Sequence, residues 1–298
     1  MDFKAELKNL VDMANAAIEK YLPKTGTHPG ELVNAMRYSV LAGGKRVRPV
    51  LMAECWRLFG GKGGEIEPFQ AAMEFIHTSS LIHDDLPAID NDDLRRGKKT
   101  THAMYGEAVG ILAGDALLNY SYEVLTEGVS KASDIKAALK AARIIAVKSG
   151  YMGMLGGQDV DVENEKTGIK GDKSDILNFI YEKKTSALIE ASMMAGAALA
   201  GAGENELAVL EEAGRKTGLA FQIYDDILDV TSTQEKLGKP VFSDVKNEKE
   251  TYVSLFGIEE ARAKVDKYTK EAVELAGSLS GDTGFLRDML SYLALREM

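Results

Sequence analysis

Apolar residues recur at three- and four-residue spacing along most of the chain, as they do in amphipathic α-helices. Clear examples are Ile135, Ala138, Leu139, Ala142, Ile145 and Ala146, and Ile176, Phe179, Ile180, Ala187, Leu188 and Ala191. Period-two alternation rich in valine, isoleucine and threonine, which is typical of strands, is nearly absent. No proline occurs in residues 88–239, and since proline costs about 3 kcal/mol inside a helix, this segment is compatible with long helices. The pattern predicts an all-α fold.

The spacing indicates about ten helices. They are expected near residues 2–21, 29–42, 48–59, 67–86, 106–128, 134–156, 173–200, 204–230, 248–276 and 283–297. Pro29 and Pro68 fall where the first turn of a helix tolerates proline. No change in composition marks an interdomain linker, and no fixed repeat occurs. We therefore expect residues 1–298 to form one domain, a bundle of ten or so helices.

Composition and charge exclude several classes of protein. The 298 residues include 36 Lys and Arg and 46 Asp and Glu, a net charge of −10, which argues against a nucleic-acid partner. The single cysteine, Cys55, excludes an internal disulfide and fits a reducing compartment. The longest uncharged stretch, residues 191–203, is shorter than the ~20 residues that span a bilayer. The N-terminus carries charges where a signal peptide needs an apolar core. We expect a cytoplasmic protein without membrane insertion.

Acidic residues interrupt apolar helical sequence at one place in the first third of the chain. Asp84 and Asp85 follow an apolar helical segment, and Pro87 should end that helix near Leu86. The two carboxylates would then project from the last helical turn, with Asp90 on the irregular segment that follows. Most acidic runs are solvated surface turns, but apolar residues flank this one on both sides.

A second acidic cluster repeats the pattern later in the chain. Asp225, Asp226 and Asp229 lie in a segment without proline, so a helix should carry them, with Asp225 and Asp229 on one face and Gln222 one turn earlier. Ionised carboxylates inside a helical bundle cost several kcal/mol each unless a cation balances them. The two clusters therefore indicate hard divalent cations held between them, and all-oxygen ligation suits Mg²⁺, which also bridges to substrate phosphates.

Cations suited to phosphate also gather in the sequence. Lys45, Arg46 and Arg48 follow a glycine pair just before a predicted helix, which suits a phosphate clamp although a solvated basic turn has the same composition. Arg95 and Arg96 follow the first acidic cluster, and Lys184 with Thr185 forms another candidate group. Taken alone, His77 is more typical of a core histidine, and Lys239 of a surface residue.

These motifs, in this order, resemble those of the trans-isoprenyl diphosphate synthases, particularly the bacterial farnesyl and the plastid or bacterial geranylgeranyl diphosphate synthases. The matching segments are GGKRVRP at 43–49, SLIHDDLPAIDNDDLRRGKKTTH at 80–102, GEAVGILAGDALL at 106–118, GGQDVD at 156–161, KKTSALI at 183–189, GLAFQIYDDILDV at 218–230 and LGK at 237–239. They cover nearly the whole chain. The resemblance implies an all-helical bundle around a deep central cavity, usually a homodimer.

The resemblance also implies a role for each matching residue. Three Mg²⁺ ions, assembled with an allylic diphosphate, would be held by Asp84, Asp85, Asp90, Asp225, Asp226 and Asp229. The same diphosphate would be contacted by Arg95, Lys184 and Lys239. The diphosphate of isopentenyl diphosphate would be bound by Lys45, Arg48, His77 and Arg96. Thr185 and Gln222 would turn their oxygens toward the allylic carbons. The family often has histidine where Lys183 precedes the Lys-Thr pair, and Arg296 is a weaker candidate for the isopentenyl site.

Product length follows from the helix before the first aspartates. Bacterial farnesyl synthases of this kind commonly carry an aromatic residue five positions before the first Asp, where this chain has Ser79, with Ser80 beside it. The next large side chain along that face is Phe75, ~6 Å further along the helix axis. That extra depth corresponds to about one isoprene unit, so we expect a C20 product, with a farnesyl synthase that stops at C15 as the alternative.

Two other kinds of protein use similar sequences. A non-catalytic subunit of a heteromeric prenyltransferase usually lacks one aspartate motif, whereas this chain has both. A terpene cyclase ionises similar substrates, but it has no need of the clamp at residues 43–49 for a second diphosphate.

Overall fold

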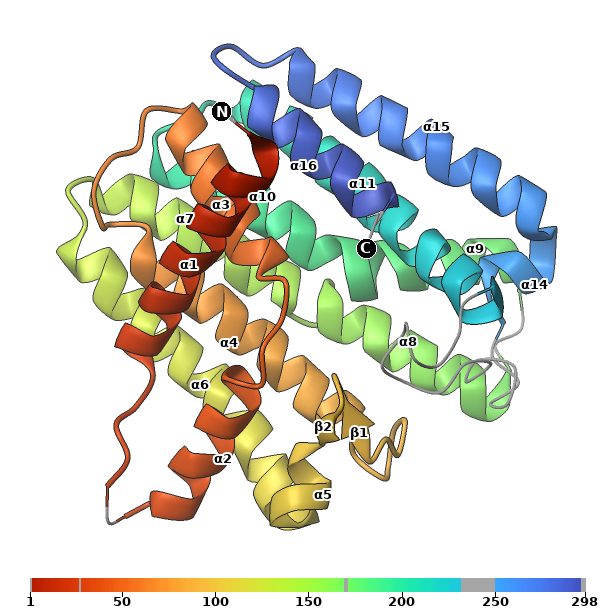
Figure 1. The fold of residues 1–298 in the computed structure, drawn as a ribbon, viewed down its shortest axis with the longest axis horizontal. Coiled ribbons are helices and arrows are strands. Elements are labelled where there is room, and N and C mark those ends of the chain that lie inside the picture. Colours follow the sequence, from red (N-terminus) through yellow and green to blue (C-terminus); the bar gives the residue numbers. More distant parts are fainter. Residues whose placement is uncertain (1, 27, 169–170, 232–249, 296–298) are drawn as a thin grey trace.

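Helices form nearly all of the regular structure in the computed structural model, which describes residues 2–26, 28–168, 171–231 and 250–295 (Figure 1). In the first half they are α1 (Phe3–Tyr21), α2 (Gly30–Val40), α3 (Val47–Leu58), α4 (Glu67–Asp84), α5 (Thr101–Tyr105), α6 (Glu107–Lys131) and α7 (Ile135–Ser149). The second half contains α8 (Met154–Thr167), α9 (Lys173–Ile180), the π-helix η1 (Tyr181–Ser186), α10 (Ala187–Leu199), α11 (Glu204–Thr231), α14 (Tyr252–Phe256), α15 (Ile258–Gly277) and α16 (Gly284–Leu295). The predicted all-α fold is confirmed.

The structure corrects several details of the sequence prediction, which included neither the short helix α5 nor the π-helix η1 within the helix expected over 173–200. The helix expected over 134–156 ends at Ser149, and the chain turns through Gly150 and Gly153 into α8, whose glycine-rich acidic sequence gave no periodic signal. The helix expected over 248–276 is divided at Gly257, which adopts a φ of +83°. A two-stranded hairpin, β1 (Leu94–Arg95) and β2 (Lys98–Lys99), was not expected from the sequence.

Helix α10 lies at the centre of the bundle and packs against α3, α7 and α11 (Figure 1). Nearly all of its side chains are buried, and most are alanine, methionine or leucine. A helix that is apolar on every side must be enclosed by other helices, so α10 organises the main core. No helix in the described ranges combines the length and apolar character needed to cross a bilayer.

The acidic cluster of the first motif is positioned by a second pair of helices. Helix α4 runs beside α6 over much of its length, and its side chains from Pro68 to Phe75 are all buried. The hairpin of β1 and β2 follows the C-terminal end of α4 and is turned by Arg96 and Gly97, both with positive φ. The end of α4, the hairpin and the nearby part of α8 therefore form one region of the molecule (Figure 1).

A buried ion pair fixes the chain before α3. Arg46, the residue before the helix, has a left-handed φ of +49°, and its guanidinium donates to Asn15, to the carbonyl of Val40 and, at 2.6 Å, to Glu74. Both charged side chains are 3% exposed. Arg46, the second of the three cations that the sequence offered as a phosphate clamp, therefore forms a structural ion pair with Glu74 on α4.

Replacing Glu74 with alanine should lower the free energy of unfolding by about 3–5 kcal/mol, because it leaves the Arg46 charge buried without its carboxylate. Urea unfolding followed by circular dichroism measures this. The matched control is Glu204→Ala, which breaks an exposed pair with Lys140 and should cost less than about 1 kcal/mol. Equal effects of the two replacements would contradict the assignment.

Candidate active site

The first acidic cluster is gathered by a turn that folds back over the end of α4. Asp84 is the last residue of the helix and Asp85 is its C-cap. The backbone N–H of Asp90 donates to the carbonyl of Asp84 at 3.0 Å, and that of Asp92 donates to the carbonyl of Asp85 at 3.2 Å. These bonds satisfy carbonyls that a helix end leaves without intrahelical partners. They also bring the Asp90 backbone against Asp84, and Asp90 lies on the irregular segment after the helix, as the sequence predicted.

The hairpin after this turn supplies a cation to the cluster. Arg95 on β1 donates from Nε to Oδ1 of Asp85 at 2.7 Å, and its Nη2 lies 2.6 Å from the same oxygen in an ion pair. The Asp85 side chain is 4% exposed. Burial raises the pKa of Asp85, while the hydrogen bonds and positive charge of Arg95 oppose that shift. Two residues with proposed roles thus lie in direct contact.

Helix α8 and η1 approach Asp84 from the other side. The Gln158 amide donates to Oδ1 of Asp84 at 2.8 Å, and Lys184 Nζ lies 3.5 Å from the same oxygen. Lys184 also pairs with the buried Asp161 at 2.7 Å. The first aspartate motif and the Lys-Thr pair, one hundred residues apart in sequence (184 − 84), therefore lie in one place.

The second acidic cluster lies on α11, an unbroken helix up to Thr231, so Asp225 and Asp229 share one face as predicted. Asp226 is buried, and its Oδ2 accepts hydrogen bonds from the Tyr181 hydroxyl and, at 2.8 Å, from the backbone N–H of Tyr252. Its carboxylate is thus oriented by donors from η1 and from the start of α14.

The π-helix η1 connects the two motifs. Its Thr185 hydroxyl donates to Oε1 of Gln222 on α11 at 2.8 Å, and Gln222 lies within 3.5 Å of Asp226. Its Lys184 reaches Asp84 on α4, as described above, and Tyr181 reaches Asp226. A six-residue element thereby contacts residues of both acidic clusters.

The donor chemistry of the two clusters fits magnesium. Every candidate ligand is a carboxylate, the hard oxygen donor that Mg²⁺ prefers. Within the described residues, no three histidine, cysteine, aspartate or glutamate side chains lie close enough to hold a metal ion by themselves. Mg²⁺ commonly binds one or two carboxylates and completes its octahedron with water and substrate phosphates. The clusters therefore fit ions that bind together with a phosphorylated substrate.

A group of basic side chains from α3, α4 and the hairpin turn lies beside the first motif. Arg48 Nη1 lies 3.3 Å from Nε2 of His77, and Arg96 donates to the carbonyl of Gly43. Burial, helped by the charges of Arg48 and Arg96, lowers the pKa of His77 well below its usual 6.5, so the ring is neutral and can accept from Arg48. Burial lowers the pKa of Arg48 to about 10.

The buried Nε of Arg48 finds no hydrogen-bond acceptor among the described residues. A buried donor without an acceptor is costly, and this one belongs to a guanidinium, which pairs well with phosphate oxygens. The structure therefore brings together Arg48, His77 and Arg96 of the predicted isopentenyl site, and its electrostatics fit an anion.

The remaining candidate residues are more scattered. Lys45 is exposed at the start of this region, and Lys183 is partly exposed beside Lys184 on η1. Ser79 and Phe75 are buried on α4, and Ser80 is partly exposed. Lys239 and Arg296 lie outside the described residues.

Sequence reasoning missed three residues that the geometry assigns to this region. They are Gln158, Asp161 and Tyr181. Gln158 and Asp161 lie three residues apart, just after the glycine pair at 156–157. A glycine pair beside polar residues indicates that another segment of backbone packs closely there, and this signal could have identified them. Tyr181 has no comparable signal, because a tyrosine at an apolar position is typical of any helix.

Comparisons with known proteins agree with this geometry. The sequence matches the Polyprenyl synthetase family over residues 29–281. It is 41% identical to the farnesyl diphosphate synthase of Bacillus subtilis (strain 168) over 269 residues, which cover 90% of each chain. It is 40% identical over 300 residues to the chloroplastic heterodimeric geranylgeranyl pyrophosphate synthase large subunit 1 of Arabidopsis thaliana, with 99% of this chain and 80% of the relative covered. The fold is similar to the solved structure of a geranyltransferase from Helicobacter pylori complexed with magnesium and isoprenyl diphosphate, with a TM-score of 0.84, 31% identity, and 98% and 96% of the two chains covered.

His77 should make the protein less stable in mild acid. Below pH 6.5 the unfolded chain takes up a proton at this residue that the folded chain, with its lowered pKa, does not, so the free energy of unfolding falls as pH decreases. This residue alone can contribute about 1.4 kcal/mol per pH unit. His77→Gln should remove that component of the slope between pH 7 and pH 5 in chemical unfolding experiments. His28→Gln, at an exposed position, is the control, and an unchanged slope in His77→Gln would show that the ring is protonated in the folded protein.

Proposed function

Because this chain belongs to the polyprenyl synthetase family, we propose that it condenses isopentenyl diphosphate head-to-tail with allylic diphosphates and extends them to a C20 product. The chain is a short-chain prenyltransferase, as the names of its relatives indicate. The observation that supports the finer proposal is the position of η1, which contacts residues of both aspartate motifs. Positively charged side chains and carboxylates lie close together around η1, an arrangement that suits a diphosphate bound through metal ions.

Arg95 and Lys184 are proposed to hold the leaving diphosphate. Each already forms an ion pair with a buried carboxylate: Arg95 with Asp85, and Lys184 with Asp161 on α8. Bound Mg²⁺, for which we propose three ions as in the family, would neutralise charge on the departing group and so lower the barrier to its loss. The two side chains contribute to the same electrostatic effect, which is often the largest component of catalysis.

The second diphosphate is proposed to bind at Arg48, His77 and Arg96. The neutral imidazole of His77 can donate one hydrogen bond while it accepts another from Arg48. A nearby exposed cation, Lys45, would add charge at the entrance. This group would hold isopentenyl diphosphate next to, but distinct from, the aspartate region.

The reaction then proceeds between the two diphosphates. The allylic C–O bond breaks, its electron pair leaves with the diphosphate, and an allylic cation remains. Thr185 and Gln222, joined by a 2.8 Å hydrogen bond, would present oxygen dipoles that stabilise the cation without trapping it. The isopentenyl double bond forms the new C–C bond, and a proton is lost to the departed diphosphate. No side chain is proposed as a general base.

Turnover with labelled isopentenyl diphosphate and geranyl diphosphate tests the reaction. Asp84→Asn and Asp225→Asn should each lower kcat by about 10²–10³-fold, because each removes charge that holds the metal-bound diphosphate, and a chelator should abolish activity. Asp159→Asn, at an exposed position on α8, is the matched control and should retain activity. A purified chain that gives no metal-dependent product would instead support the non-catalytic subunit.

The proposed product length rests on the side chains below Asp84. Ser79 is small and buried, and Phe75 lies one turn earlier on α4. The ring of Phe75 lies 5.9 Å from that of Tyr120 on α6, centroid to centroid, and the Tyr120 hydroxyl donates to the carbonyl of Tyr21 at 2.9 Å. We assign the Phe75 and Tyr120 rings as the floor that stops chain growth, ~6 Å deeper than Ser79.

A replacement above this floor and one in the floor itself should change the product length in opposite directions. Ser79→Tyr should shift the main product from C20 to C15, because a ring at that position blocks the channel one isoprene unit earlier. Phe75→Ala should give products longer than C20. Chromatography of labelled products measures both, and Ser80, the other serine predicted to influence chain length, is tested in the same way as Ser80→Tyr. If the unmodified enzyme makes mainly C15, the assignment of the floor is wrong.

The proposal includes the whole chain as one domain and a homodimer, as the family resemblance implies. Apolar side chains that a partner copy would cover are present: Ile111 and Leu112 on α6 are 47% and 56% exposed, and Leu155 on α8 is 42% exposed. Light scattering on the purified protein gives the number of subunits.

A further inference from the structure

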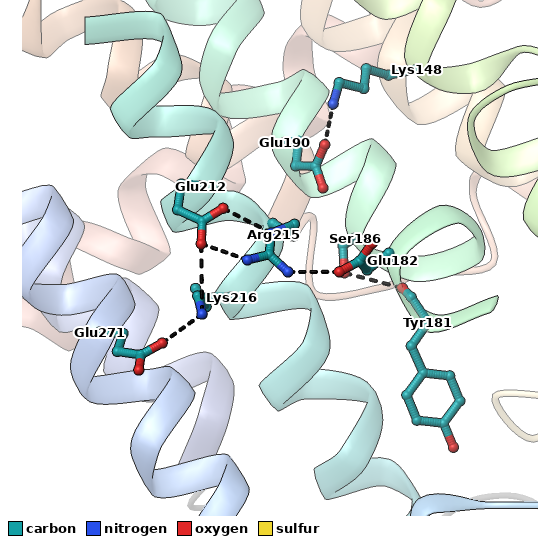
Figure 2. Close-up of polar contacts among 9 residues, drawn as sticks. All are labelled: Lys148, Tyr181, Glu182, Ser186, Glu190, Glu212, Arg215, Lys216 and Glu271. Carbon is teal, nitrogen blue, oxygen red and sulfur yellow. Dashed lines mark hydrogen bonds and ion pairs between the residues drawn. The ribbon is translucent and has the colours of Figure 1, made fainter. Parts of the chain in front are cut away.

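A network of charged side chains links η1 to α11 and α15 (Figure 2). At its centre Arg215 on α11 donates from Nε and Nη2 to the two carboxylate oxygens of Glu212, at 2.8 and 2.6 Å. Its remaining nitrogen, Nη1, donates to Glu182 of η1 at 2.6 Å. The two-point bond to Glu212 fixes the guanidinium plane, so the bond to Glu182 has a defined direction.

Other helices hold this network in turn. Lys216, the next residue of α11, lies 3.6 Å from Glu212 and 2.6 Å from Glu271 on α15. Hydrogen bonding from Arg215 lowers the pKa of Glu212, so its carboxylate is charged at neutral pH. The Glu182 and Arg215 side chains are 32% and 30% exposed, so solvent screens this pair only in part. The network therefore joins η1 to a rigid pair of helices.

Backbone packing holds η1 close to α8 and α11. A Cβ added to Gly157 of α8 would lie 2.2 Å from the backbone nitrogen of Lys184, and one added to Gly218 of α11 would lie 2.4 Å from Cα of Ser186. Such contacts require glycine, and they set the distance between the elements. Hydrogen bonds are directional, so the polar bonds of η1 add to this packing a preference for one angle of the element about its own axis.

The π-helical turn makes this angle important. A π turn holds one more residue than an α turn, and the Ser186 hydroxyl supports it by donating to the Tyr181 carbonyl at 3.1 Å (Figure 2). If the turn relaxed to α-helix, one end would rotate by about 100° relative to the other. Lys184 and Thr185 would then point away from Asp84 and Gln222.

We propose that Glu182 and Arg215 form a positioning pair that sets the rotation of η1 and so aims Lys184 and Thr185 into the site. The pair touches no substrate group itself. This inference rests on the proposed function, because it assigns Lys184 and Thr185 to the allylic diphosphate and its cation. It adds residues that lie outside every motif identified in the sequence.

The test compares Glu182→Ala, Arg215→Met and the double variant with Lys216→Met, which alters the same network at a residue that contacts α15 instead of η1. Glu182→Ala and Arg215→Met should each lower kcat by about 10–100-fold, as small misplacements of catalytic groups do. The KM for isopentenyl diphosphate should stay within twofold, since Arg48 and His77 lie elsewhere. Lys216→Met should retain kcat within about twofold.

Three further readouts separate positioning from general destabilisation. The double variant should lose no more kcat than either single variant, because both remove one interaction. Glu182→Gln, which keeps the acceptor oxygen, should recover most of the kcat. Melting temperatures should change by about 2 °C or less, as expected for a half-exposed ion pair in a chain of this size.

The activity of the unmodified chain tests the proposed function, and the kcat values of the variants test the positioning role. If the unmodified chain transfers prenyl groups but Glu182→Ala matches Lys216→Met in kcat, or if the loss of kcat follows the fall in melting temperature, the positioning role is wrong and the proposed function stands. If the unmodified chain shows no prenyl transfer, both are wrong.

Discussion

The arrangement of the site depends on the balance between buried carboxylates and the cations that neutralise them. Asp85 and Asp161 are both almost inaccessible to solvent, and each lies in direct contact with a cation, Arg95 and Lys184 respectively. Charges in such positions are tolerated only in matched sets. Arg48 is different, because it lies beside a neutral His77 and near the like charge of Arg96, so this part of the site carries an excess of positive charge. Carboxylates on one side and guanidinium groups on the other give the site two chemically different halves, and this asymmetry suits two diphosphates with different fates.

The element that contacts residues of both acidic clusters is short and adopts an uncommon form, a π-helix. Six residues of η1 interrupt an otherwise continuous helix of α9 and α10, and their side chains reach α4, α8 and α11. Interruptions of this kind occur frequently at functional sites. An α-helix through the same residues could not direct Tyr181, Lys184 and Thr185 to these partners at once, because the spacing of the side chains would differ. The contacts among these residues thus coincide with a local departure from regular helical structure.

The sequence was informative where a residue contradicted its surroundings. Aspartates within apolar helices, and a proline after Asp85, were sufficient to predict the two clusters, the end of α4 and the helical face shared by Asp225 and Asp229. Elements with no such contrast were missed: α8 lacks a periodic apolar face, and the hairpin has strands of only two residues, too short for alternation to be visible. The partners of the network around Arg215 could not be inferred either. Glu182 is paired with a residue 33 positions away, and charged residues at exposed helical positions look alike in a sequence.

The contact between Phe75 and Tyr120 ties three helices together. Tyr120 belongs to α6, its hydroxyl is anchored at the end of α1, and its ring lies against α4. A substitution near the end of α1, which belongs to neither aspartate motif, would therefore act on the ring that borders Phe75 rather than on the proposed metal ligands and diphosphate contacts. Catalytic power and substrate fit can for this reason change separately during divergence, so an enzyme with every motif intact can acquire a new specificity through residues that no motif contains.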